Sequence, residues 1–262
     1  QQLLLFFFPI LFGTFFQQLY NTADAMIVGK FVGKEALSAV GGTTGTLINL
    51  LVGFFVGMSS GAAVVVSQFY GAKEDQQVQK SVHTSFCLAL AGGVALLVIG
   101  EIFTPAAIRA MGAPEEILGY SVTYLRIYFL GIIGNLVYNM GAGILRAVGD
   151  SKRPLYFLIV CALANTGLDL LFVAVFGLGT AGAAMATSLS QLICAGLVIW
   201  VLLRIPGDCR LHLSELRFDG ALLRRMTAIG LPAGLATIMY SVANVIIQKA
   251  INLLGTDTAA AW

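Results

Sequence analysis

The sequence predicts an all-α membrane protein, and three observations lead to this fold class. The chain is 58% hydrophobic and only 11% charged, with a mean hydropathy of +0.88, whereas soluble domains carry about 25% charged residues. Apolar segments long enough to cross a bilayer core, which takes about 20 residues, recur along the chain. Their apolar runs, such as LLFVAVF and ICAGLVIWVLL, lack the alternation of a transmembrane β-barrel. The segments must therefore be helices, because only a helix or a closed barrel satisfies its backbone in lipid.

Seven spans are expected, the first six forming one lobe. They lie at about residues 3–29, 46–70, 82–104, 119–141, 155–176, 181–204 and 228–254. We expect an N-terminal transmembrane lobe over residues 1–204, a cytoplasmic linker over 205–227, and a seventh helix within 228–262.

The seventh helix repeats features of the first. Three residues of the first segment match residues of the seventh at a constant offset: Pro9 matches Pro232, Thr14 matches Thr237, and Asn21 matches Asn244. After one deletion, Gly33 also matches Gly255. Shared apolar composition is the simpler explanation. The alternative is that the seventh helix opens a second six-helix repeat, as in many transporters. The full protein would then have about twelve helices, with this chain as its first half plus one.

The first segment carries an unexpected carboxylate, Asp24, with Asn21 and Gln17 on the same helical stripe. We expect Asn21 and Gln17 to line a substrate cavity. A charge at the centre of a bilayer costs about 2.5–3.5 kcal/mol on insertion scales.

In the second segment, Gly53, Gly57 and Gly61 share one face and predict close helix packing.

The third and fourth segments carry polar groups of open assignment. Glu101 lies at the end of its segment, where the side chain can reach the interface. Arg126 can reach the interface or pair with a carboxylate. Tyr128 and Asn139 could line a cavity or join helices. In the loop that follows, we interpret "RAVGD", with Arg146, Gly149 and Asp150, as a cap that fixes the turn rather than as a substrate contact.

The fifth and sixth segments add a second acidic group. Asp169 follows Asn165 by four residues on one helix face, and the sixth segment offers Thr187. Carboxylate, amide and hydroxyl oxygens are the ligands that a hard cation prefers. Together with Asp24, this cluster could bind Na⁺ or H⁺, or it could be a purely structural polar network.

Loop charges predict the orientation. Ten Lys and Arg residues lie on the side of the even-numbered loops, including the linker, against three on the other side. By the positive-inside rule the ten mark the cytoplasm, and the N-terminus lies on the same side. Both His83 and His212 lie at these cytoplasmic ends, where we expect them to be exposed.

The chain resembles the multidrug and toxic compound extrusion (MATE) transporters over nearly its whole length. The resemblance is carried by Pro9, "LYNTADAMIVGKFVG", "GILRAVGDSKRP", "NTGLD" and Thr187, in this order. It implies two six-helix lobes facing each other across a cleft and export of organic cations or other amphipathic compounds in exchange for Na⁺ or H⁺. It further implies a cation site at Asp24, Asn165, Asp169 and Thr187, a cavity-lining Gln17, and a helix that bends at Pro9. A bacterial inner membrane and a monomeric complete protein are expected.

Other function classes find less support. No GxxxxGK[ST] motif and no nucleophile–base pair occurs, so we expect neither an enzyme nor a cofactor, and no nucleic acid partner. A lipid-linked oligosaccharide flippase of the same superfamily would need cationic side chains in its cavity. A non-transporting membrane scaffold would not need two intramembrane carboxylates.

Overall fold

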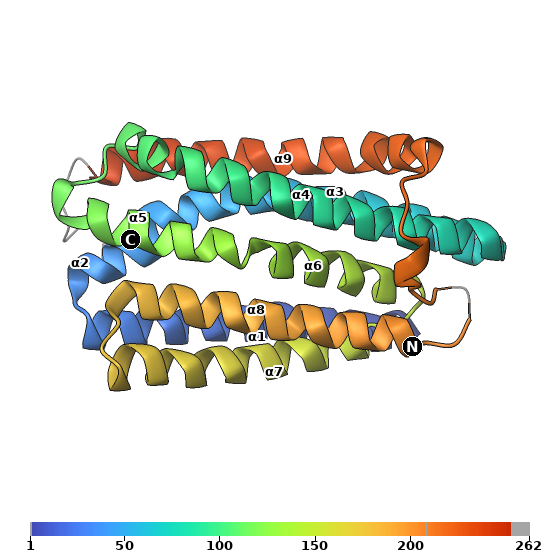
Figure 1. Cartoon of the computed structure of the whole chain (residues 1–262), viewed down its shortest axis with the longest axis horizontal. Coiled ribbons are helices and arrows are strands. Elements are labelled where there is room, and N and C mark those ends of the chain that lie inside the picture. Colours follow the sequence, from blue (N-terminus) through green and yellow to red (C-terminus); the bar gives the residue numbers. More distant parts are fainter. Residues whose placement is uncertain (1, 208, 253–262) are drawn as a thin grey trace.

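A computed structural model describes residues 2–207 and 209–252, and within these residues every regular element is helical (Figure 1). The elements are α1 (Gln2–Phe31), α2 (Lys34–Leu37), the π-helix η1 (Ser38–Thr44), α3 (Gly45–Ala72), α4 (Asp75–Ala110), α5 (Glu115–Leu130), α6 (Ile132–Ala147), α7 (Lys152–Asp169), the π-helix η2 (Leu170–Val175), α8 (Gly179–Arg204), the 3₁₀ turn η3 (Leu213–Glu215) and α9 (Gly220–Asn252).

The expected spans match the long helices. Five stretches are long and apolar enough to cross a membrane, namely Lys34–Ala72, Asp75–Ala110, Lys152–Val175, Gly179–Arg204 and Gly220–Ile251. A sixth span is the pair α5 and α6, which bends by 52° at Gly131. The remaining expected span, residues 3–29, coincides with the 30-residue helix α1, whose C-terminal half carries the polar residues Gln17, Asn21 and Asp24.

The helices lie nearly side by side, with α5 and α6 in the middle (Figure 1). On one side of this central pair lie α3, α4 and α9, and on the other lie α1, α7 and α8. The main packing partners agree with this view: α3 packs on α9 and α6, and α7 packs on α1 and α8. The central span therefore packs against both groups, and the buried apolar residues form two clusters.

The glycine face of α3 packs against α9, which confirms the prediction of close helix packing. A Cβ added at Gly57 would overlap the backbone of Gly234, and one at Gly61 would overlap that of Gly230. At Gly53 the added atom would meet the Thr237 side chain. Because pairing positions rise along α3 as they fall along α9, the two helices run antiparallel.

The linker differs from the expected 205–227. The last helix begins at Gly220, so residues 220–227 extend α9 rather than lying in a separate surface segment. Asp219 caps it, because its Oδ1 accepts the backbone N–H groups of Ala221 and Leu222 at 3.0 and 3.1 Å. Like α1 with Pro9, α9 contains a proline in its interior, Pro232. Gly255, the last member of the repeat, lies outside the described residues.

Candidate functional site

Two carboxylates from separate helices lie buried in the lobe. Asp24 of α1 is 8% exposed, and Asp169, the last residue of α7, is fully buried. Asp169 lies within electrostatic range of Asp24. One oxygen of Asp24 and both oxygens of Asp169 are buried without a hydrogen-bond partner. Buried carboxylate oxygens without a hydrogen-bond donor favour the binding of a proton or a cation, which satisfies them.

An amide and a hydroxyl complete this group. The Asn165 Nδ2 atom donates to Thr187 Oγ1 of α8 at 3.4 Å. The other polar atom of this amide, Oδ1, is buried and has no hydrogen-bond partner. The four side chains therefore present several unpartnered oxygens, as a site for a hard cation requires. We call Asp24, Asn165, Asp169 and Thr187 the carboxylate site. The sequence predicts these four residues as one site, and the structure places Asn165 against Thr187 and Asp169 within electrostatic range of Asp24.

Sequence reasoning missed one residue beside the carboxylate site. Tyr124 of α5 is buried and lies near Thr187, Asp24 and Asp169. Its ring stacks on that of Tyr128, with the ring centroids 6.4 Å apart. A lone tyrosine in an apolar segment gives no signal in the sequence. Only the packing of α5 against α8 reveals its neighbours.

The helix geometry changes next to Asp169. The six residues that follow it, Leu170–Val175, form the π-helix η2. Single π-helical turns within α-helices are frequent at functional sites, because they alter the backbone hydrogen bonding of the helix. The wider turn ends the regular part of α7 at the carboxylate itself.

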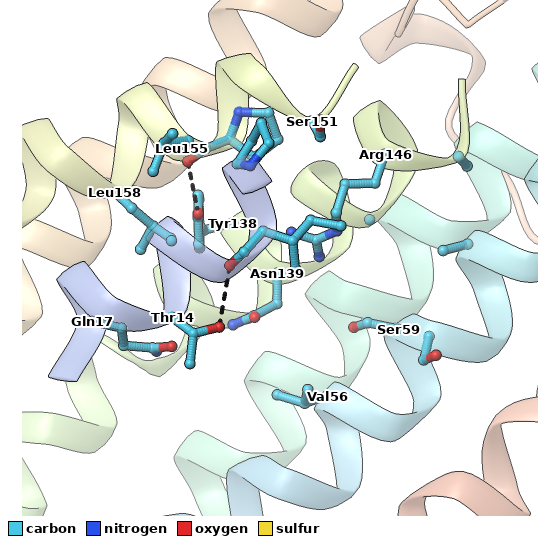
Figure 2. A pocket seen from close by; sticks show the side chains of 18 of the residues that line it. Thr14, Gln17, Val56, Ser59, Tyr138, Asn139, Arg146, Ser151, Leu155 and Leu158 are labelled. Carbon is cyan, nitrogen blue, oxygen red and sulfur yellow. Dashed lines mark hydrogen bonds between the residues drawn. The ribbon is translucent and has the colours of Figure 1, made fainter. Parts of the chain in front are cut away.

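A separate cavity of about 590 Å³ lies among α1, α3, α6 and α7, and we call it the inner cavity. It is lined by apolar side chains such as Val56 and Leu158 and by polar ones such as Ser59 and Asn139. Figure 2 shows Gln17 and Thr14 on one side of it and Ser59 on another. None of the carboxylate-site residues lines the inner cavity.

The predicted cavity residues divide between lining and non-lining positions. Gln17 and Asn139 line the inner cavity, and so does Pro9, for which only a helix bend was expected. Asn21 does not, being exposed on α1 with its Nδ2 donating to Gln18 Oε1 at 3.2 Å. Tyr128 does not either, because it is buried in an apolar cluster.

The "RAVGD" turn has two parts with different surroundings. Gly149 has a positive φ of 92°, and Asp150 Oδ1 accepts the backbone N–H groups of Lys152 and Arg153 at 3.2 and 3.1 Å. These two residues fix the turn and start α7. Arg146 instead lines the inner cavity, into which its side chain extends in Figure 2. The interpretation of Arg146 as part of the loop device alone is therefore incomplete.

Arg126 lies away from both sites. Its Nε is 3.8 Å from Glu101 Oε2, and its side chain is about half exposed. The sequence left two roles open for Arg126, and the structure shows the pairing with a carboxylate, that of Glu101.

The histidines are not both exposed, so that expectation was wrong. His83 is only 3% exposed, because the linker folds over it. Its Nδ1 donates to the Gln79 carbonyl at 2.7 Å, and its Nε2 accepts the backbone N–H of His212 at 3.0 Å. Ligand atoms of His83, His212 and Glu215 lie within 4.8 Å of one another. Because both ring nitrogens of His83 are occupied, this cluster serves to hold the linker.

The comparisons with known proteins agree with this architecture. The MatE family model matches residues 9–171. The probable multidrug resistance proteins YoeA and YpnP of Bacillus subtilis are 33% and 30% identical over 98% and 100% of this chain and over 57% and 58% of their own lengths. An inward-facing multidrug resistance MATE family transporter of the MOP superfamily superposes with a TM-score of 0.85 at 26% identity, over 94% of this chain and 56% of that one. The chain thus spans just over half the length of these proteins.

Proposed function

Because the chain belongs to the MatE family of multidrug and toxic compound extrusion transporters, we propose that the protein is a secondary active exporter of small amphipathic or cationic compounds. Inward flow of Na⁺ or H⁺ would drive the export. The observation that carries the coupling proposal is the pair of buried carboxylates, Asp24 and Asp169, with unpartnered oxygens.

The carboxylate site would bind the coupling ion. Two carboxylates without bound cation or proton repel each other in a desolvated space, so occupancy by either stabilises the pair. Asn165 and Thr187 would contribute neutral oxygens to the same ion. One elementary charge moving inward under 100 mV supplies about 2.3 kcal/mol, which suffices to concentrate an uncharged substrate several tens-fold outside.

The first helix would transmit ion binding to the cavity. It carries Asp24 of the carboxylate site as well as Pro9 and Gln17 of the inner cavity. A proline in a helix interior removes a backbone hydrogen bond and permits a kink. We propose that α1 changes its bend at Pro9 when the charge of Asp24 is neutralised.

The charge distribution supports a cytoplasmic N-terminus. The α3–α4, α6–α7 and α8–α9 connections, which hold most of the basic residues, lie at the same end of the bundle as the N-terminus (Figure 1). The inner cavity lies toward this end, since the turn residue Ser151 and the last turn of α6 line it. Relatives from Bacillus suggest a bacterial cytoplasmic membrane, and we propose residues 205–219 as the cytoplasmic connection between two lobes.

Dye efflux from membrane vesicles tests the proposal. Vesicles that contain the full-length protein are loaded with ethidium, and Na⁺ and pH gradients are imposed separately. We expect one of the gradients to accelerate ethidium efflux. Efflux that responds to neither gradient would exclude secondary transport.

Two variants test the carboxylate site in the same assay. Asp24→Asn and Asp169→Asn keep the shape of each side chain but remove the ionisable group, so we expect gradient-driven efflux to be lost. Glu116→Gln is the matched control, because it also removes one carboxylate, but from an exposed position at the start of α5. Full efflux by both aspartate variants would rule out this coupling mechanism.

A further inference from the structure

The inner cavity contains one charged group, and it is a cation. Among the described residues that line it, Arg146 is the only one with a formal charge, and no carboxylate is present. Apolar side chains from three helices, including Ile10, Val56 and Leu155, line much of the remainder. The cavity therefore offers an apolar surface with one positive pole.

Arg146 has no acidic partner within the described part of the chain. The nearest acidic residue in sequence, Asp150, is already committed: its Oδ2 lies 3.2 Å from Arg153 Nε, and its Oδ1 caps α7. The ion pairs found there join Arg153 to Asp150 and Arg126 to Glu101. A half-buried guanidinium without a counter-ion is costly, which favours an anionic ligand at its side.

The other polar groups of the cavity are largely occupied by the protein itself. Asn139 donates its amide to the Asn135 carbonyl at 2.9 Å and to Asn135 Oδ1 at 3.0 Å. Tyr138 donates to the Pro154 carbonyl at 3.2 Å, and Ser59 donates to the Phe55 carbonyl at 3.0 Å. The guanidinium, with five N–H donors, thus has the largest free donor capacity in the cavity.

We propose that the inner cavity binds amphipathic substrates that carry one carboxylate or sulfonate group, with Arg146 holding that group. This inference rests on the proposed export function and specifies its substrate class. Guanidinium pairs with a planar carboxylate through two parallel hydrogen bonds, which gives orientation as well as affinity. A single cation suits a single anionic group, whereas a lipid-linked pyrophosphate would call for several.

Separation of the two charged sites follows from this assignment. The coupling cation would bind at Asp24 and Asp169, and the anionic group of the substrate would bind at Arg146, so the two would not compete for one set of ligands. An inside-negative membrane potential favours both the entry of the coupling cation and the exit of an anion. Zwitterions with one carboxylate fit the cavity by the same contact.

Two fluorescent dyes that differ only in this group provide the test. Rhodamine 110 has a free carboxylate, and rhodamine 123 is its methyl ester. Binding of each dye to the full-length protein in phosphatidylcholine nanodiscs is followed by fluorescence anisotropy, which needs no ion gradient. We expect the wild-type protein to bind rhodamine 110 at least about tenfold more tightly than rhodamine 123.

Variants then assign the preference to Arg146. Arg146→Gln should weaken rhodamine 110 binding about tenfold or more and leave rhodamine 123 binding unchanged, and Arg146→Lys should restore part of the difference. Arg153→Gln removes the same charge from an exposed position near the same turn and should keep the preference. Equal binding of the two dyes by the wild-type protein, or an equal loss of both in Arg146→Gln, would overturn the proposal.

The readout separates this inference from the function on which it rests. Gradient-driven efflux of rhodamine 110 from vesicles reports secondary transport, and the nanodisc experiment reports the preference for the carboxylate. A preference that depends on Arg146 without gradient-driven efflux would remove the transport proposal alone. Gradient-driven efflux without the preference would remove the anion site alone.

Discussion

Gly57 of α3 and Gly234 of α9 meet backbone to backbone, so that any side chain at position 57 would occupy the place of the Gly234 main chain. This contact joins the second long helix of the chain to the last one. Together with Gly61 and Gly230, one turn further along, it brings the backbones of α3 and α9 into direct contact.

Substitution of Gly57 tests this contact. Gly57→Ala should destabilise the protein by about 1–3 kcal/mol, because the helices must separate to admit the methyl group. Thermal unfolding of the purified full-length protein measures the change. Gly71→Ala is the control, since it lies in the same helix with open space around it and should be neutral or slightly stabilising. Equal effects of the two substitutions would contradict the packing argument.

Thr187 provides a test of the carboxylate site that keeps both acids. Thr187→Val has nearly the same shape but loses the hydroxyl that accepts a hydrogen bond from Asn165. We expect the concentration of coupling ion that gives half-maximal efflux to rise about tenfold, as the loss of one ligand or hydrogen bond implies. Thr166→Val, on the adjacent turn of α7, should leave it unchanged, because that hydroxyl bonds only its own helix. A response shared by both variants would indicate a general loss of helix packing.

His83 is expected to hold the linker to the bundle. His83→Ala removes the acceptor of the His212 backbone N–H and should speed proteolytic cleavage within residues 205–219 about tenfold, since a lost buried hydrogen bond costs about 1–3 kcal/mol. Limited proteolysis of the protein in detergent measures the rate. His212→Ala keeps the backbone N–H and should have a smaller effect. If cleavage were faster in His212→Ala than in His83→Ala, the side chain of His212 would be the anchor instead.

Asp150 allows its two interactions to be separated. Asp150→Ala removes the cap of α7 and the ion pair with Arg153, and we expect a loss of about 1 kcal/mol, mostly from the cap. Asp150→Asn keeps an acceptor for the cap and loses only the ion pair, worth about 0–1 kcal/mol at this partly exposed position. Thermal unfolding compares the two. An equally large loss in both variants would show that the ion pair, and not the cap, stabilises the turn.

Much of the fold could be predicted from the sequence because helix formation in lipid depends on local composition. The spans at 82–104 and 181–204 fall within α4 and α8. The 52° bend between α5 and α6 escaped the sequence reasoning. Gly131, between the two helices, was the only local sign of a break. The structure explains why this residue is a glycine, because a Cβ there would overlap Ser188 of α8.

The candidate site was predictable in its members but not in its surroundings. Asp24 and Asp169 stand out in the sequence because an acidic residue in an apolar segment is rare. Tyr124 and Arg146 could not be assigned in this way. One looks like an ordinary aromatic core residue and the other like an ordinary basic loop residue until the positions of α8 and of the inner cavity are known.

The sequence by itself determined that this is a membrane protein, which segments form its helices, and which of those helices carry ionisable groups. Each of these properties follows from the residues of one segment. Only the tertiary structure decided that α3 pairs with α9, that the acids of α1 and α7 are both buried within electrostatic range of each other, and that Arg146 lies in a cavity without a carboxylate. The reason is that contacts between helices depend on how side chains far apart in the chain fit together, and a helical pattern specifies a face without specifying its partner.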